Sequence, residues 1–453
     1  MTTKVKCGSH ILDKIFQKHL SSKKLTTEKV IPPNYITKKD IPNNPYISSV
    51  TSEYAFDLSK ISKFNVYFWK STDDINQNPA IKDYIEYYST ASIDWSTYYK
   101  TQALKAFNQY TSFSDTTSSV VNTYEGSDVV CVLGNFNGIL GACYGPYYLY
   151  NDPVYVDGRV ILFLSAGYTT DVNITEGGEQ FSTLVHEWGH GFGLAHPHDN
   201  GLGSTIMPGM SNITCYDTGY CAANPYKYPG IAGNIQNNSF NTIMTYNDFL
   251  FFFPEQEDYI TNDIGYPETL MPLDASALRW LYNLKGVSKA YSLKYGAKVI
   301  NPAEGTQKTQ MIAGDNQEIT FGSNCYDVSF YFSNQSISFN NLNPTKYEYN
   351  RILEKQWTFY PKDLCSTVSI LNFGNISVSN IFMEKNALKT NLTVNCLSNT
   401  VLNIYIVDCE KNYCICGTTD YTIKGTTYKN KSTGKKMTIN NISNATINVF
   451  FNK

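Results

Sequence analysis

The sequence predicts an α+β domain followed by an all-β, sandwich-like domain. Three observations support this fold class. Strand-like segments and an amphipathic helix alternate between residues 64 and 164, and a second helical segment near residue 184 carries closely spaced histidines. Beyond residue 286, short alternating segments are separated by Asn, Gly and Ser clusters, which is typical of an antiparallel β-sandwich. We therefore expect a basic tail and linker at 1–50, the main domain at 51–285, and a β-rich accessory domain at 286–453.

Composition limits the partners that this chain can have. Its net charge is −3 over 453 residues, which argues against nucleic acid as the main partner. Residues 1–40 hold nine lysines and three acidic residues, a net charge of +6 that leaves −9 for the remainder. Apolar runs are too short for a Sec-type signal peptide or a membrane span. We expect secretion by another route, or association with a particle or virion, rather than a resident cytoplasmic enzyme.

The main domain is predicted from hydrophobic periodicity. Alternation of apolar and polar residues at 64–69 predicts a strand, and apolar residues at helical spacing between 95 and 110 predict an amphipathic helix. The run at 159–164 is apolar throughout and bounded by glycines, which favours a buried strand. Further strands are expected at 120–123, 128–133 and 138–144.

Four of the six histidines lie in the segment 184–198, which reads L-V-H-E-W-G-H-G-F-G-L-A-H-P-H. His186 and His190 are four residues apart, so a helix projects both imidazoles from one face. Gly193 can end this helix in a left-handed conformation and turn the chain so that His196 reaches the same point. Three imidazoles and a water form an open zinc site, and Glu187 is placed to act as the base for that water.

These five residues resemble the long zinc signature of the metzincin peptidases, H-E-x-x-H-x-x-G-x-x-H. The sequence of this segment is most similar to that of the serralysin branch, in which Pro-Gly-Asp commonly follows the third histidine. Pro197 and Asp199 fit that pattern, whereas His198 stands at the position of the glycine. We expect His198 to be an exposed loop residue; a surplus metal ligand is the alternative. The resemblance covers 51–285 and implies a twisted mixed sheet above the zinc helix.

The resemblance also implies an edge strand that binds the substrate backbone and a methionine turn below the metal. By its order in the chain, 138–144 is the candidate strand, with Gly138, Ile139, Leu140, Gly141 and Ala142 as substrate-binding residues. An interior strand or a hairpin is the alternative. Met244 is favoured over Met207 for the turn, because a helix-like segment resembling the last helix of the family starts about thirty residues after Met244. Tyr246 would then stabilise the oxyanion; a packed aromatic is the alternative.

The function implied is that of a zinc-dependent endopeptidase with one catalytic zinc and a protein or peptide substrate. Glu187 would act as general base and Tyr246 as a second catalytic residue. The alternative is a weak or inactive protease-like scaffold in a larger assembly, which the intact Glu187 argues against. A hydrolase of another bond is a further alternative. Cys7, in K-C-G-S-H, resembles the inhibitory cysteine of matrix metalloprotease zymogens only in Cys-Gly, so an ordinary thiol is expected.

The accessory domain lacks the G-G-x-G-x-D repeats with which bacterial serralysins bind calcium, so calcium binding is doubtful. Its alternating segments predict strands that could place the protease on a larger assembly. These segments are 328–332, 367–371, 392–396, 401–407 and 445–451.

Overall fold

The computed structural model describes residues 5–7, 17–18, 35–37, 42, 45–151, 158–198, 201–207, 242–246, 266–267, 269–284, 291–295, 307–311, 317–321, 327–332, 356–361, 368–373, 378–384, 391–396, 401–408, 414–415, 421–424, 427–430, 436–441 and 446–450. These residues fall into two compact units. The first is drawn from 1–223, 243–246 and 277–285, and the second from 224–242, 247–276 and 286–453.

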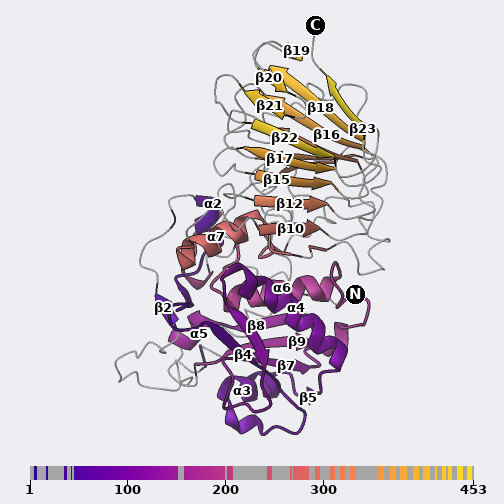
Figure 1. The fold of residues 1–453 in the computed structure, drawn as a ribbon. Helices are drawn as coiled ribbons and strands as arrows, with labels where there is room; N and C mark the ends of the chain where they lie inside the picture. The colour runs from indigo at the N-terminus through magenta and orange to yellow at the C-terminus, as the bar shows by residue number, and fades with distance from the viewer. Residues whose placement is uncertain are drawn as a thin grey trace. The chain divides into compact units, whose positions relative to one another are not determined.

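The first unit contains a mixed sheet, in agreement with the predicted α+β class (Figure 1). Its strand order is β1-β8-β9-β7-β4-β6, with β5 paired to β7. Neighbouring strands are parallel except for β8 with β9 and β5 with β7, which are antiparallel. The bounds are β1 Val5–Cys7, β4 Lys63–Phe68, β5 Ser92–Ile93, β6 Thr117–Val120, β7 Val129–Gly134, β8 Ile139–Tyr144 and β9 Val160–Ser165. A separate antiparallel pair joins β2 (Tyr35–Thr37) to β3 (Tyr54–Phe56).

The central strands are buried because their sequences are apolar on both faces. Every residue of β7 (V-V-C-V-L-G) and of β9 (V-I-L-F-L-S) is buried, as expected for strands covered on both sides. The prediction of a strand at 120–123 was wrong. The strand there is β6, which ends at Val120 and pairs with β4 through the polar residues at 117–119. A strand at the end of a sheet can expose polar side chains, so its apolar pattern is weak.

Two helices of the first unit begin at residues whose side chains cap them. Ser96 caps α4 (Thr97–Phe113) by accepting from the Tyr99 N–H, so the predicted helix at 95–110 begins two residues later. Asn78 caps α3 (Pro79–Tyr87) in the same way. The remaining helices are α2 Pro45–Ser48, α5 Pro146–Asn151, α6 Glu179–Gly191 and α7 Pro272–Tyr282, with 3-10 turns at 75–77, 166–168 and 201–203.

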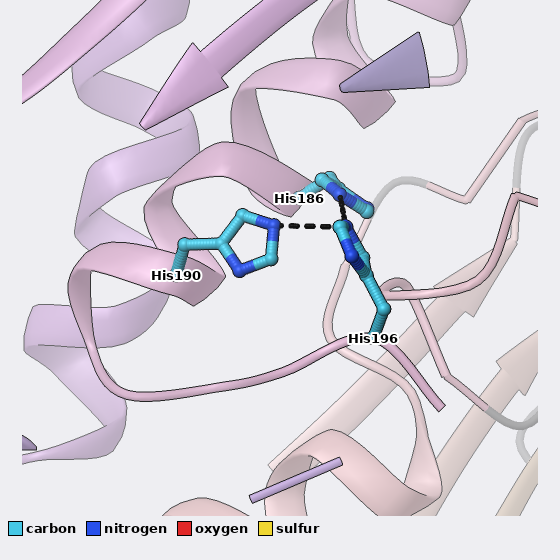
Figure 2. Close-up of side chains that lie close together, drawn as sticks. All are labelled: His186, His190 and His196. Carbon is cyan, nitrogen blue, oxygen red and sulfur yellow. Dashed lines mark hydrogen bonds between the residues drawn. The ribbon is translucent and has the colours of Figure 1, made fainter. Parts of the chain in front are cut away.

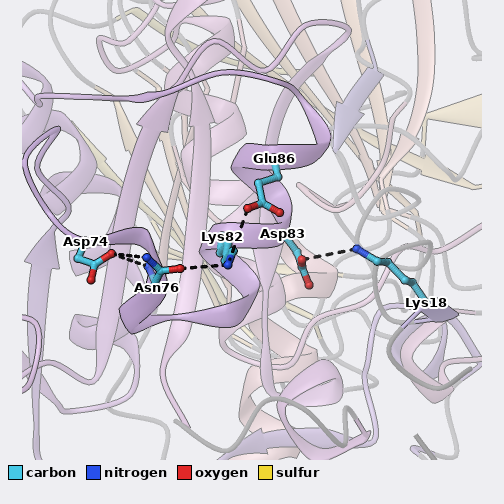
Figure 3. A network of polar contacts seen from close by, with 6 residues as sticks. All are labelled: Lys18, Asp74, Asn76, Lys82, Asp83 and Glu86. Atoms are coloured by element: carbon cyan, nitrogen blue, oxygen red, sulfur yellow. Dashed lines mark hydrogen bonds and ion pairs between the residues drawn. The ribbon is translucent and has the colours of Figure 1, made fainter. Parts of the chain in front are cut away.

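A surface network of polar contacts surrounds the start of α3 (Figure 3). The backbone N–H of Asn76 donates to Asp74, and this hydrogen bond lowers the pKa of the Asp74 carboxyl. Lys82 donates to Asn76 over 3.0 Å and lies 3.9 Å from Glu86. Exposed pairs of this kind contribute little to stability, so the network orients the helix end without anchoring it.

Helix α6 is held by aromatic packing. Phe192, its C-terminal capping residue, stacks on Tyr110 of α4 at 4.9 Å, and Phe107 meets Trp188 edge to face at 4.6 Å. The Tyr110 hydroxyl donates to the Val185 carbonyl over 2.5 Å, which ties α4 to α6 through a buried hydrogen bond. The helix also contacts β8 and β9. Its position over the sheet is therefore set by large buried rings on one side and by two strands on another.

The described strands of the second unit are mostly parallel, so the expected antiparallel sandwich was wrong. One sheet has the order β10-β12-β15-β17-β22-β21-β20, and another has β11-β14-β13-β16-β18-β19 with β23 on β18. Among these described strands, the antiparallel pairs are β18 with β19, β20 with β21, and β21 with β22. The bounds are β10 Tyr291–Tyr295, β11 Gln307–Met311, β12 Gln317–Phe321, β13 Asp327–Phe332, β14 Gln356–Pro361, β15 Val368–Phe373, β16 Val378–Glu384, β17 Leu392–Cys396, β18 Val401–Asp408, β19 Cys414–Ile415, β20 Tyr421–Lys424, β21 Thr427–Asn430, β22 Lys436–Asn441 and β23 Thr446–Phe450.

Successive strands β15 to β18 alternate between the two sheets, which is the connectivity of a parallel β-solenoid. The register places Asn395 between Asn372 and Asn440 in one sheet, and Asn403 between Asn380 and Asn448 in the other. The register also pairs Val394 with Ile439, and both side chains are buried. A repeat with asparagines eight residues apart therefore underlies this region, and similar residues stack from one coil to the next.

No helix in the described part of the chain is long and apolar enough to cross a membrane.

Candidate metal centre

The chain reverses sharply after helix α6. Gly193 has φ +90°, and its N–H donates to the His190 carbonyl over 3.1 Å. A Cβ at this position would lie 2.5 Å from the Tyr54 carbonyl oxygen, so both the conformation and the space require glycine. The Leu194 N–H then closes on the Gly189 carbonyl at 2.8 Å. This reversal returns the chain toward the face of α6 that carries His186 and His190.

The three predicted histidines converge (Figure 2). His196 Nε2 lies 3.1 Å from His186 Nε2 and 3.0 Å from His190 Nε2. All three side chains are buried, and together they could hold a metal ion. Imidazole nitrogens around one tetrahedral zinc lie about 3.3 Å apart, because zinc–nitrogen bonds are about 2.0–2.1 Å long. The spacing of the three Nε2 atoms therefore suits one ion.

Backbone carbonyls fix the tautomers of two of these rings. His186 Nδ1 lies 2.8 Å from the Ile243 carbonyl oxygen, and His190 Nδ1 lies 3.0 Å from that of Leu194. A carbonyl only accepts, so each Nδ1 carries the proton and donates it. Each Nε2 is then left with a lone pair directed at the common point, which is the arrangement usual for metal-binding histidines.

Glu187 is fully buried on α6, where strand β8 approaches the helix closely. A Cβ on Gly141 would lie 3.0 Å from Glu187 Cγ and 2.9 Å from Thr183 Cγ2. Glycine at this position of β8 therefore allows the close approach. Burial raises the pKa of the neighbouring Cys143 thiol, and the negative charge of Glu187 raises it further.

The structure also brings Tyr246 to two of the three histidines and Met244 to the helix that carries His186 and His190. Met244 is buried, and a Cβ added to Gly189 of α6 would lie 2.5 Å from its sulfur. The Tyr246 ring is centred 4.7 Å from that of His196 and 5.9 Å from that of His186. Met207 is buried as well, and its N–H donates to the Pro197 carbonyl over 2.9 Å. Each methionine thus contacts a different part of the histidine segment.

The expectation that His198 is an exposed loop residue was wrong. Its side chain is 1% exposed, and its ring stacks on His196 with centroids 5.2 Å apart and planes inclined by 15°. The physical reason is the backbone hydrogen bond from Met207 to Pro197, which holds the segment after His196 inside the unit. Sequence reasoning did not place His198 in the site because this partner lies ten residues further along.

The expectation that β8 is a free edge strand also needs correction. The short N-terminal strand β1 pairs with it in parallel, with Val5 opposite Ile139 and Cys7 opposite Gly141. Of the five predicted substrate-binding residues, Gly138 precedes the strand, with φ +90° and its N–H on the Tyr168 hydroxyl. The other four, Ile139, Leu140, Gly141 and Ala142, lie in β8 and are buried.

Several predicted features fall outside the described residues. These include Asp199 and most of the lysine-rich tail. Asp274, which sequence reasoning missed, is buried at the start of α7 and accepts from the Met271 N–H and the Thr242 hydroxyl. The signal that could have found it is the Pro-Leu-Asp run at the expected helix start.

Among the comparisons with known proteins, matches come from solved structures alone. No protein-family model matches the sequence, and no curated protein matches it. Among solved structures, that of myroilysin matches with 13% sequence identity, covering 57% of this chain and 90% of that chain, at a TM-score of 0.26. A TM-score this low supports no inference about fold or function. What the chain itself provides is a cluster of three histidines that could hold a metal ion.

Proposed function

We propose that this chain is a zinc-dependent endopeptidase of the metzincin type. The observation that carries the proposal is the convergence of His186, His190 and His196 with two of their Nδ1 atoms held by backbone carbonyls. A zinc ion bound by these three residues would lower the pKa of a water molecule and polarise a substrate carbonyl. Three protein ligands leave a coordination position for substrate, as catalytic sites require.

Glu187 is the proposed general base. It takes a proton from the attacking water and delivers it to the leaving amine, so no covalent intermediate forms. Its burial between α6 and β8 shields the carboxylate from bulk water, which strengthens its interaction with a nearby cation. The raised pKa of the Cys143 thiol keeps that neighbour protonated, so Glu187 does not share the site with a second anion.

Tyr246 is the proposed second catalytic residue. Its ring packs against two of the histidines while the side chain stays partly exposed, so its hydroxyl can reach a bound peptide. A phenol that donates a hydrogen bond to the developing oxyanion stabilises the transition state more than the substrate. Met244 is the proposed methionine of the turn below the site.

Strand β8 is the proposed substrate strand, which binds an extended peptide by adding it to the sheet. The segment Val5–Cys7 already occupies that position in the parallel direction. An entering substrate must therefore displace β1, and the N-terminal segment competes with it. Residues 1–50 would then act as a regulatory tail on the peptidase domain at 51–285, and 286–453 would serve as an accessory domain for a larger assembly.

The experiment that tests the proposal is hydrolysis of denatured casein by the full-length protein. We expect cleavage that is lost when 1,10-phenanthroline removes the zinc and restored by stoichiometric Zn²⁺. Cleavage that persists after the metal has been removed would contradict a zinc mechanism. A zinc-loaded protein that cleaves neither casein nor any member of a peptide library would favour the scaffold alternative.

A further inference from the structure

The histidine segment carries a fourth imidazole that the zinc site does not use. His198 belongs to a cluster of three rings with His196 and Tyr246, and all three pairwise centroid distances lie between 4.7 and 5.2 Å. Among the described residues, the group that could hold a metal ion consists of the other three histidines and excludes His198. The role of this buried ring is therefore different from that of the three histidines that could hold the metal.

We propose that His198 is a positioning residue that holds the Tyr246 ring against the metal ligand His196. This inference rests on the proposed function, in which Tyr246 contributes to catalysis. In serralysin-like sequences the corresponding position is glycine, which has no side chain to support either ring. Here the imidazole fills that position, so the support for the tyrosine comes from the same segment that supplies the third ligand.

The geometry explains how one ring can support two others. His198 stacks on His196 with planes 15° apart, and it meets Tyr246 at 4.8 Å with planes inclined by 58°. Tyr246 in turn meets His196 at 4.7 Å and 67°, so it contacts both imidazoles at a steep angle. Tilted aromatic contacts of this kind are favourable and restrict the ring. Removal of His198 would take away one of the three imidazoles that contact Tyr246.

The backbone just before His198 is fixed independently of the rings. The Ala195 N–H donates to the Val50 carbonyl over 3.1 Å, and the Pro197 carbonyl accepts from the Met207 N–H over 2.9 Å. The His198 ring is 1% exposed, whereas Tyr246 is only partly buried. The buried His198 ring is therefore the one that positions the partly exposed Tyr246 ring. A truncation at His198 should leave the path of the chain intact and loosen Tyr246.

The test compares His198→Ala with His198→Phe, which keeps a flat ring, each alone and combined with Tyr246→Phe. We expect His198→Ala to lower kcat about tenfold with little change in KM, as the loss of a residue that orients a catalytic group does. The kcat of His198→Phe should be close to that of the wild-type protein. In the Tyr246→Phe background, His198→Ala should lower kcat no further, because the hydroxyl that it positions is already gone. Tyr98→Phe, at a half-exposed tyrosine on α4, is the matched control.

Two measurements that do not depend on activity complete the test. The zinc dissociation constant, measured by competition with a chelator, should change by less than about tenfold in His198→Ala. A complete loss of zinc that Phe does not restore would make His198 a ligand and overturn the proposal. The shifts in urea midpoint caused by His198→Ala and Tyr246→Ala should be non-additive in the double variant, because the two rings touch. Additive midpoints, or independent losses of kcat, would also overturn it. If wild-type protein cleaves nothing, the proposed function fails, while the midpoints still report the ring contact.

Discussion

Packing of Met244 beneath α6 can be tested by adding one methyl group to that helix. In Gly189→Ala, the new Cβ would lie 2.5 Å from Met244 Sδ and 3.0 Å from the Tyr110 hydroxyl oxygen. Both partners are fully buried, and the Tyr110 hydroxyl is already engaged with the Val185 carbonyl. Neither side chain can move away without disturbing the packing between α4 and α6.

Two opposing free-energy contributions decide whether Gly189→Ala stabilises or destabilises the protein. Replacing glycine by alanine inside a helix gains about 0.5–1 kcal/mol from the backbone alone. Overpacking a filled core costs about 1–3 kcal/mol. We therefore expect Gly189→Ala to destabilise the protein by up to about 2 kcal/mol. Without the contacts with Met244 and Tyr110, the same substitution would stabilise the protein. Gly191→Ala, at the last residue of the same helix, is the comparison: its Cβ would meet Val160 Cγ1 at 3.2 Å, a contact that a small shift of the valine can relieve, so a smaller loss is expected.

The assay is urea denaturation of zinc-loaded protein, with each variant compared by its midpoint. Met244→Ala alone should cost about 2–5 kcal/mol, as buried methionines do. In that background Gly189→Ala should destabilise less, since the sulfur is gone and only the contact with the Tyr110 hydroxyl at 3.0 Å remains. If Gly189→Ala alone raised the midpoint as far as the helix gain predicts, Met244 would not pack beneath α6 and its assignment to the turn would fail.

Three further predictions concern other parts of the first unit. Burial raises the thiol pKa of both Cys131 and Cys143, so neither should be alkylated at pH 8 until the protein unfolds; peptide mapping of iodoacetamide adducts checks this. Burial also raises the pKa of the Asp128 carboxyl, so the stabilisation that comes from its protonated form is present at low pH and is lost as the pH rises through the raised pKa. Asp128→Asn should remove this loss of stability from the pH dependence of the urea midpoint. Deletion of residues 1–7 should lower KM for peptides with kcat unchanged, and an unaltered KM would mean that β1 does not compete with substrate.

Local physics explains why the convergence of His186, His190 and His196 could be predicted from the sequence. The four-residue spacing of His186 and His190 depends only on helix geometry, and the reversal at Gly193 depends only on backbone sterics. The buried strands β7 and β9 were predicted for a similar reason, because an unbroken apolar run has few alternatives in a folded chain.

Long-range pairing explains what the sequence did not reveal. His198 is buried because Met207 binds the adjacent carbonyl, and β1 covers β8 although more than a hundred residues separate them. The parallel pairing of the second unit was missed for another reason. Alternation within single strands does not distinguish parallel from antiparallel neighbours, whereas the repeated asparagines, such as Asn395 and Asn403, do show which segments are equivalent.

The measurement that tests the central claim most directly is the zinc content and casein hydrolysis of Glu187→Gln. The substitution removes the proposed base and leaves His186, His190 and His196 in place, so we expect about one zinc per chain and nearly complete loss of hydrolysis. Glu176→Gln, which alters an exposed carboxylate paired with Lys105, should keep both the zinc and the activity. Normal hydrolysis by the zinc-loaded Glu187→Gln protein would contradict the mechanism proposed for this site.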